Sequence, residues 1–260
     1  MISDTQIREA FHFYFLDRLL KQSDPGLYIL KGGVNLRFFF KSPRYSEDMD
    51  IDVLAGSVQT LKKNGYKILN DGAFKRSLRS FDIADIEIND PAKSKQTGTT
   101  QRFRFGLITP SGHRLPTKVE FSRRNESGDG ESESALVDTE IARFYRRLSF
   151  RCPHYTGGAA IVQKVRALAG RPVTQARDVF DLAILFRGGH RSFSDWSQLI
   201  TDEEHAKAID CLMGLTWQEY EGQVVEFLET GSREEYGSKN AWNALQNMVL
   251  SWLESDAQAT

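Results

Sequence analysis

Residues 48–53 read Asp-Met-Asp-Ile-Asp-Val, a strict alternation of acidic and apolar side chains. A period of two is typical of a β-strand, so this segment is expected to present its aspartates on one face and its apolar residues on the other. Alternate residues of a strand lie about 7 Å apart, and carboxylates at that spacing repel unless water or a cation lies between them. The strand is therefore either an exposed sheet edge or a platform for a metal ion.

A glycine pair precedes this segment. Lys31-Gly32-Gly33 lies between a short predicted strand and a short predicted helix. Paired glycines allow the backbone to approach a phosphate, and the start of a helix offers free N–H groups. Ser46 adds a hydroxyl donor just before the acidic strand. Phosphate donors this close to paired carboxylates are typical of metal-dependent phosphoryl transfer.

Such a site usually takes a third carboxylate from a neighbouring strand. Residues 115–122 are predicted to form one, with Lys118 and Glu120 on its polar face. Two interpretations of Glu120 remain open: it joins the aspartates, or it forms a cross-strand ion pair with a lysine or arginine.

Two predicted helices further along the chain carry paired charges. Lys164 and Arg171 are seven residues apart, which places them on one flank of a helix, about 10 Å apart along its axis. They could span a triphosphate, or they are two solvated bases beside an apolar stripe. Asp178 and Asp181 share a face with leucines in the next helix. Acids on an apolar face are expected to meet a buried cation, with Lys164 or Arg171 as the partner.

The secondary-structure signals change near residue 150. Strands and helices are mixed before it, including a predicted strand at residues 66–70 and a surface loop at 125–134. Helices are predicted beyond it, at residues 157–170, 175–187, 202–214, 217–230 and 238–254. We therefore expect an α+β fold with a mixed α/β domain at residues 1–150 and an all-helical domain at residues 151–260.

Composition and missing motifs exclude several classes of protein. A chain of 260 residues with 40% hydrophobic and 27% charged residues is expected to bury an ordinary core. Its apolar runs are far shorter than a membrane span, and no secretory signal is visible. Two distant cysteines favour the cytoplasm and argue against a cysteine-rich zinc site. No P-loop, dinucleotide fingerprint or His-Glu-x-x-His motif occurs.

Charge is distributed unevenly along the chain. Residues 1–199 hold 31 Lys and Arg against 23 Asp and Glu, a net +8, whereas residues 200–260 hold 3 against 12, a net −9. Polyanions are thus expected to meet the basic part, without sequence-specific DNA binding. The simplest interpretation of the acidic part is a solvated helical face.

These motifs, taken in order, resemble the AbiEii/AbiGii toxin family, nucleotidyltransferase-like toxins of bacterial toxin–antitoxin, abortive-infection and phage-defence systems. The matching stretches are residues 31–36 (Lys-Gly-Gly-Val-Asn-Leu), 44–50 (Arg-Tyr-Ser-Glu-Asp-Met-Asp), the lysine motif at 164–171 and the Arg-Asp-x-x-Asp motif at 177–181. The resemblance covers about residues 28–187, and residues 200–260 have no clear counterpart. Val34 departs from the family's usual Thr or Ser, and Asp52 extends the family's Asp-x-Asp.

The resemblance implies a DNA-polymerase-β-like nucleotidyltransferase fold, a mixed sheet with helices, followed by an all-helical C-terminal domain. It implies that Asp48 and Asp50 hold Mg²⁺ or Mn²⁺, the pair being chosen by its spacing from Gly33, with a frame shifted to Asp52 as the alternative. Lys164 would neutralise the triphosphate, and Asp178 would either fix that lysine or act on the acceptor. Glu120 would complete the metal site or take a proton from the acceptor. The residues implied in nucleotide binding are Lys31, Gly32, Gly33, Arg44, Ser46, Lys164 and Arg171.

The implied reaction transfers a nucleoside monophosphate from an NTP to RNA or protein and releases pyrophosphate. Some relatives act on tRNA ends and others prefer GTP, and the sequence chooses neither. The implied partner is a cognate antitoxin encoded beside the gene. A competing hypothesis is a non-catalytic nucleotide- or RNA-binding module that acts by sequestration, and another is an interaction protein with an acidic helical tail.

Overall fold

The computed structural model describes residues 2–90, 97–123, 130–190 and 199–257. The chain divides into two compact units. Unit 1 comprises residues 1–39, 45–128 and 132–154, and unit 2 comprises residues 40–44, 129–131 and 155–260. The fold is α+β, as predicted, and each unit is described by itself below.

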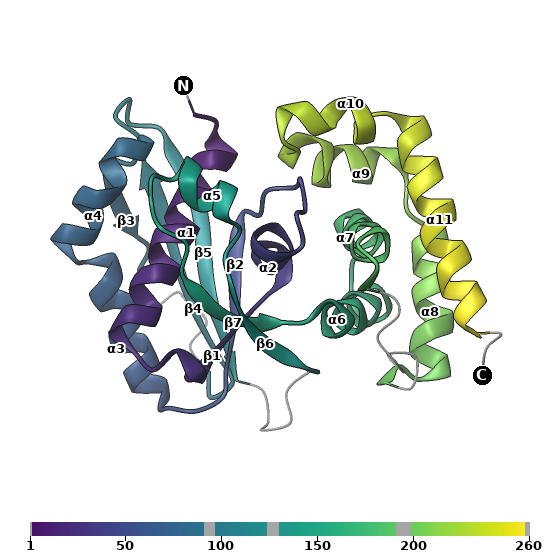
Figure 1. Cartoon of the computed structure of the whole chain (residues 1–260), viewed down its shortest axis with the longest axis horizontal. Coiled ribbons are helices and arrows are strands. Elements are labelled where there is room, and N and C mark those ends of the chain that lie inside the picture. Colours follow the sequence, from purple (N-terminus) through teal and green to yellow (C-terminus); the bar gives the residue numbers. More distant parts are fainter. Residues whose placement is uncertain (1, 91–96, 124–129, 191–198, 258–260) are drawn as a thin grey trace. The chain divides into compact units, whose positions relative to one another are not determined.

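Unit 1 is built on a seven-stranded sheet with the order β3-β4-β5-β2-β1-β7-β6 (Figure 1). Its strands are β1 (Tyr28–Lys31), β2 (Asp48–Val53), β3 (Asp85–Ile88), β4 (Thr100–Ile108), β5 (Arg114–Arg123), β6 (Ser132–Leu136) and β7 (Arg151–Tyr155). Its helices are α1 (Asp4–Gln22), α2 (Gly32–Phe39), α3 (Val58–Leu69), α4 (Gly72–Leu78) and α5 (Thr139–Phe144). Strand β2 runs parallel to β5 and antiparallel to β1, so it lies between two strands rather than at an edge.

The alternation along the central strands separates an apolar face from a polar one. Met49 and Ile51 of β2 and Val119 of β5 are fully buried and belong to one hydrophobic core. Phe11 of α1 completes this core, its ring lying 4.8 Å from that of Phe105. Helices α1, α3 and α4 pack on this side of the sheet (Figure 1). The aspartates of β2 are thereby directed to the opposite, polar face.

The strand predicted at residues 66–70 is wrong, because the chain is helical there. Ser57 caps α3 by accepting a hydrogen bond from the Thr60 N–H, and the helix continues to Leu69. Leu61 and Ile68 lie seven residues apart on the same face of α3, and both are buried in the core. The apolar residues that suggested a strand are the last turn of this helix.

Two strands were missed. Strand β6 lies partly within the predicted loop at 125–134, of which residues 125–129 fall outside the described structure. Strand β7 lies where helices were expected to begin, and it pairs in parallel with β1 through Leu30 and His154. His154 stacks on Phe39 with ring centroids 3.6 Å apart. Such contacts, distant in sequence, leave no periodic signal.

Unit 2 is helical in its described parts. Its helices are α6 (Gly157–Gly170), α7 (Ala176–Arg187), α8 (Asp202–Met213), α9 (Trp217–Gln223), α10 (Arg233–Tyr236) and α11 (Lys239–Ala257). Helix α6 packs on α7 and α8, and α11 packs on the same two helices. Tyr220 stacks on the buried Trp242 with ring centroids 4.7 Å apart. The helix predicted at 217–230 is shorter than expected, since α9 ends at Gln223 and a 3₁₀ turn follows.

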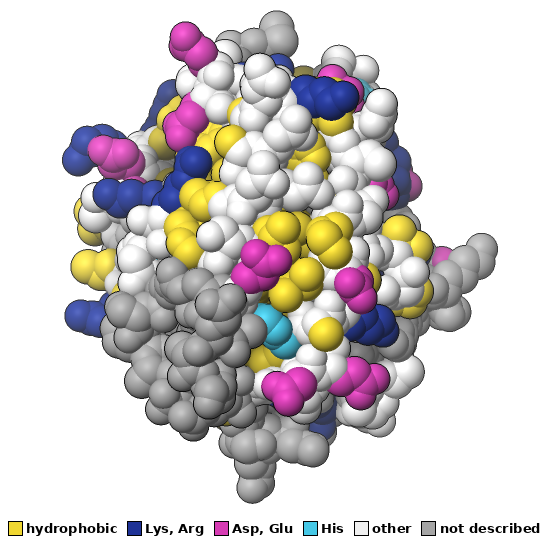
Figure 2. Space-filling model, turned by 90° about the vertical axis from the view of Figure 1, so that its right-hand side faces the viewer, with side chains coloured by type: hydrophobic (Ala, Val, Ile, Leu, Met, Phe, Trp, Pro, Cys, Tyr) yellow, Lys and Arg dark blue, Asp and Glu magenta, His cyan; other side chains and the backbone are white. Residues whose placement is uncertain are grey.

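Most of the described acidic side chains between residues 200 and 254 lie at the surface of unit 2. Figure 2 shows acidic side chains scattered among apolar and uncharged ones on this side of the unit. The exposed acids are Asp202, Glu203, Asp210, Glu221, Glu226, Glu234, Glu235 and Glu254. This exposure agrees with the interpretation of a solvated helical face. Across the described parts of the chain, no helix combines the length and apolarity needed to cross a membrane.

His12 makes the stability of unit 1 sensitive to acid. It is buried in α1, with Nε2 3.3 Å from Thr117 Oγ1. Burial and the nearby Arg8 lower the pKa of His12 to about 3. Below pH 6.5 the unfolded chain binds a proton here and the folded chain does not, so stability falls as the pH drops toward 3.

We expect His12 to cause a loss of about 2 kcal/mol in unfolding free energy between pH 7 and pH 5. Urea denaturation of wild type and His12→Gln at both pH values measures this loss. The variant should show a smaller loss than the wild type. The matched control is His113→Gln, because His113 is exposed. Equal losses in the wild type and His12→Gln would show that His12 protonates freely in the folded protein.

Candidate active site

Strand pairing brings the predicted carboxylates of unit 1 together. In the register of the sheet, Asp50 lies between Lys31 of β1 and Glu120 of β5, and Asp48 lies beside Lys118 of β5. Asp48, Asp50 and Glu120 therefore share the polar face of adjacent strands, the arrangement that a metal platform requires.

Most of these carboxylates already have a cationic partner. Lys118 Nζ lies 2.9 Å from Asp48 Oδ2, and Lys31 Nζ lies 2.5 Å from Asp52 Oδ1. Asp52 is completely buried, so its carboxylate serves to neutralise Lys31 inside the sheet.

Glu120 forms the cross-strand ion pair of the second interpretation. Its Oε2 lies 2.5 Å from Arg102 Nε, which is the cross-strand ion pair. It also faces Asp50 directly in the register of β2 and β5. The side chain of Glu120 is 17% exposed, and a third carboxylate in this position raises the density of negative charge beside Asp50.

Asp50 differs from the other acids of this site. Within the described part of the chain it makes no ion pair of its own. Burial raises its pKa, Lys118 and Lys31 oppose that rise, and Glu120 and Asp48 add to it. A carboxylate in these surroundings gains from the approach of a cation.

The start of α2 lies against Asp50. Gly32 has a φ of +69°, and a Cβ atom placed on it would lie 3.1 Å from Asp50 Oδ2. Gly33 is the second residue of the same helix. The hydroxyl of Ser46 donates a hydrogen bond to the carbonyl oxygen of Asp48 at 2.8 Å and so orders the entry to β2. The backbone thus approaches the carboxylates as closely as the glycine pair suggested.

A divalent cation fits this geometry when a phosphate ligand comes with it. The described residues contain no group of three His, Cys, Asp or Glu that could hold a metal ion by itself. Mg²⁺ is usually bound by one or two carboxylates together with water and substrate phosphates. Asp48 and Asp50 supply two such carboxylates, since both are hard oxygen ligands on one face of a strand.

Replacing Gly32 by alanine is expected to lower the unfolding free energy by about 1–2 kcal/mol, because a side chain is strained at positive φ. Nucleotide binding is expected to fall as well, because the new methyl group presses on Asp50. Urea denaturation and nucleotide titration measure the two effects. Gly231→Ala is the control, since a Cβ there meets nothing within 4 Å. If Gly32→Ala behaved like this control, the close approach of α2 to Asp50 would contribute neither to stability nor to nucleotide binding.

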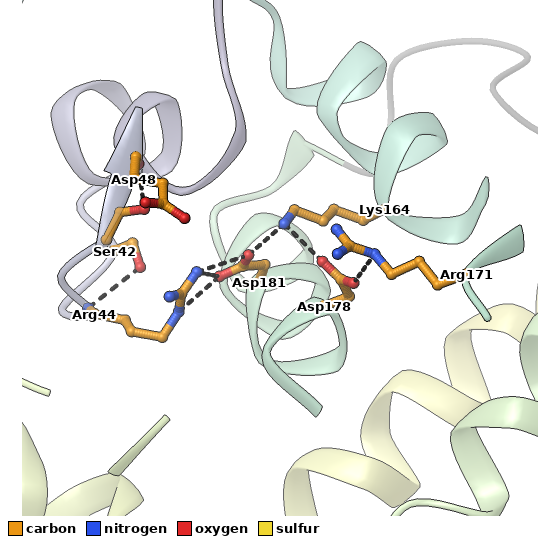
Figure 3. A network of polar contacts seen from close by, with 8 residues as sticks. Ser42, Arg44, Asp48, Lys164, Arg171, Asp178 and Asp181 are labelled. Carbon is orange, nitrogen blue, oxygen red and sulfur yellow. Dashed lines mark hydrogen bonds and ion pairs between the residues drawn. The ribbon is translucent and has the colours of Figure 1, made fainter. Parts of the chain in front are cut away.

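Unit 2 contains a continuous chain of ion pairs around two buried aspartates (Figure 3). Arg44 Nη2 contacts both carboxylate oxygens of Asp181 at 3.0 Å. Lys164 Nζ lies 2.6 Å from Asp181 and 2.9 Å from Asp178, and Asp178 in turn lies 3.1 Å from Arg171 Nε. Both aspartates are completely buried. The predicted meeting of these acids with Lys164 and Arg171 is confirmed.

Three cations and two carboxylates alternate in this network, so it carries a net charge of +1. Burial alone would lower the pKa of Lys164, but the carboxylates of Asp178 and Asp181 outweigh it and the pKa is raised. Burial would raise the pKa of Asp181, but Arg44 and Lys164 lower it. Lys164 and Asp181 are therefore ionised at neutral pH, and the formal surplus of one positive charge in the network suits an anion.

The predicted site residues fall into two groups. Unit 1 holds Lys31, Gly32, Gly33, Ser46, Asp48, Asp50 and Glu120, and unit 2 holds Arg44, Lys164, Arg171 and Asp178. Sequence reasoning did not find the pairing of Arg44 with Asp181, which are 137 residues apart. It also gave no role to Lys118 and Arg102, which pair with the carboxylates of the sheet.

A mixed sheet whose central strand presents Asp48 and Asp50 beside a glycine-initiated helix is the arrangement that the resemblance to nucleotidyltransferases implies. Residues 14–251 match the family described as "Nucleotidyl transferase AbiEii toxin, Type IV TA system". The chain therefore belongs to the AbiEii toxin family of nucleotidyltransferases from toxin–antitoxin systems. The resemblance deduced from its motifs is confirmed.

Solved structures agree on the fold. MenT4, a nucleotidyltransferase toxin from Mycobacterium tuberculosis, is 16% identical with a TM-score of 0.64, over 96% of this chain and 84% of that one. JHP933 from Helicobacter pylori is 16% identical with a TM-score of 0.54, over 100% of this chain and 97% of that one. A search of curated proteins finds no match.

Proposed function

We propose that this nucleotidyltransferase uses Mg²⁺ or Mn²⁺ to transfer a nucleoside monophosphate from an NTP to an RNA or protein acceptor. The observation that carries the proposal is the pair Asp48 and Asp50 on one face of β2, with Asp50 against the start of α2. Bound there with the NTP, the metal ion would supply charge neutralisation at the triphosphate.

The residues of unit 1 would orient the reacting phosphate. Asp48 and Asp50 would hold the metal-bound triphosphate, and the N–H groups of Gly32 and Gly33 would donate to its oxygens. Glu120 lies opposite Asp50, where it could accept the proton of the acceptor hydroxyl. The acceptor oxygen would form a bond to the α-phosphorus while the bond to pyrophosphate breaks.

The partly exposed cations of unit 2 would bind phosphate groups. Lys164 and Arg171 are the two cations of the buried network with some exposure, 11% and 39% of their side chains. Asp178 contacts both, which supports a positioning role for it rather than contact with the acceptor. Asp181 contacts both Arg44 and Lys164, so Arg44 would fix the position of Lys164 indirectly, through Asp181.

We place this activity in a toxin–antitoxin system that halts the growth of the host cell, for example during phage infection, with a cognate antitoxin as partner. The free cysteines Cys152 and Cys211 fit a cytoplasmic setting. GTP as donor and tRNA as acceptor are the first pair to test.

The test incubates the protein with each of the four α-³²P-labelled NTPs, Mg²⁺ and total cellular RNA and protein. We expect label from one NTP in one fraction, and no label with EDTA or in Lys164→Met. If no label appears but Mg²⁺ and an NTP raise the melting temperature, the sequestering module replaces the transferase. If neither occurs, the metal platform is ruled out.

A further inference from the structure

The polar face of the sheet carries two cations directly opposite each other. Lys118 of β5 and Arg104 of β4 are register partners in the antiparallel pair. Directly opposed side chains have Cβ atoms about 5 Å apart, and like charges in that position destabilise a sheet. Asp48, Lys118 and Arg104 are register partners across β2, β5 and β4, and they form one row of the sheet. Two adjacent cations in this row favour the binding of an anion.

The neighbouring rows are neutralised and this one is not. Arg102 pairs with Glu120 at 2.5 Å, and Arg114 pairs with Glu87 at 3.2 Å. In the described chain, Arg104 is exposed and contacts no acid. Among the described residues, the ion-pair partner of Lys118 is Asp48, at 2.9 Å, so the row of Asp48, Lys118 and Arg104 carries a formal surplus of one positive charge.

We propose that Lys118 and Arg104 form a phosphate-binding site for the backbone of an RNA acceptor, and that Lys118 becomes available to it when a divalent cation takes Asp48. This inference rests on the proposed function, because it assumes that Asp48 is a metal ligand. Lys118 is the counter-ion of Asp48 in the free protein, and its side chain is 27% exposed, so it can turn away from β2.

The charges favour RNA over an acidic protein surface. Releasing Lys118 raises the surplus from one positive charge to two, on β5 and β4, of which β5 is adjacent to the carboxylates of β2. Phosphodiesters supply negative charges at regular intervals, and a Lys–Arg pair binds them without reading sequence. The acceptor would thus bind more tightly once the metal is in place.

Two measurements test the proposal without turnover. The first is Mn²⁺ binding in the presence of a non-hydrolysable NTP, followed by electron paramagnetic resonance. Lys118→Met should bind Mn²⁺ about two- to fivefold more tightly than wild type, because no ammonium competes for Asp48. Arg104→Met should leave Mn²⁺ affinity unchanged, since Arg104 contacts no acid in the described structure.

The second measurement is the binding of a fluorescent 12-nucleotide RNA with and without Mg²⁺, with a non-hydrolysable NTP present throughout, over a series of salt concentrations. Wild type should bind more tightly with Mg²⁺. Lys118→Met and Arg104→Met should each weaken binding in Mg²⁺ and reduce the salt slope by about 1. The control is Arg114→Met, whose guanidinium is already engaged by Glu87 and Asn89.

The outcomes separate this inference from the proposed function. If wild type binds Mn²⁺ and transfers nucleotides but the variants bind RNA as wild type does, the Lys118–Arg104 site is wrong and the transferase stands. Label in protein, with RNA affinity indifferent to Mg²⁺, would also overturn the RNA site. If wild type binds no Mn²⁺ with or without an NTP, both proposals fail.

Discussion

Asp50→Asn is expected to reduce nucleotidyl transfer at least about 100-fold without destabilising the protein. The raised pKa of Asp50 means that its ionised carboxylate is unfavourable in the free protein, so a neutral amide of the same shape should leave the urea midpoint unchanged or higher. Transfer falls because an amide cannot supply the negative charge that holds the metal. Single-turnover kinetics and urea denaturation at pH 7 measure the two effects.

Asp52→Asn on the same strand should show the opposite pattern. Asp52 is completely buried and pairs with Lys31 at 2.5 Å. Its loss would leave a largely buried lysine without its carboxylate, which is expected to cost about 3 kcal/mol of stability. Transfer should stay within about tenfold of wild type when the folded fraction is matched. Loss of activity without loss of stability in Asp52→Asn would shift the metal pair to Asp50 and Asp52.

The second large effect is on stability. Asp181→Asn is expected to lower the unfolding free energy by about 3–5 kcal/mol, because Asp181 is completely buried and binds both Arg44 and Lys164. Removing one member of a buried ion network leaves the remaining charges uncompensated. Urea denaturation at pH 7 measures the loss.

Asp210→Asn is the matched control for Asp181→Asn, since Asp210 lies exposed on α8. Its effect should be within about 0.5 kcal/mol of zero. A loss of less than about 1 kcal/mol in Asp181→Asn would mean that water or a rearranged side chain compensates Arg44 and Lys164. The network would then be less rigid than its distances indicate.

Local patterns predicted the elements that carry the carboxylates. Alternation at residues 48–53 gave β2 and its polar face, and the helical spacing of Asp178 and Asp181 gave their meeting with Lys164. Both signals are local, because buried positions repeat along a strand or a helix with a fixed period. The predicted strand at 66–70 failed because a short apolar run suits either a strand or the last turn of a helix.

Contacts between distant segments were not predictable in this way. Alternation placed the three aspartates on one face, but it could not show that Asp52 is buried against Lys31 while Asp48 stays 31% exposed beside Lys118. That difference depends on which strands flank β2. The Arg44–Asp181 pair likewise depends on how residues 40–44 join unit 2. Strand order and chain packing are tertiary properties, and a single sequence carries no periodic trace of them.

The claim that Asp48 and Asp50 hold a metal–nucleotide complex is tested most directly by Mn²⁺ binding with a non-hydrolysable NTP, followed by electron paramagnetic resonance. Wild type should bind Mn²⁺ in a nucleotide-dependent manner. The double variant Asp48→Asn/Asp50→Asn should remain folded and lose this binding. If the folded double variant bound Mn²⁺ with the nucleotide as tightly as wild type, the metal site would lie elsewhere and the central claim would be wrong.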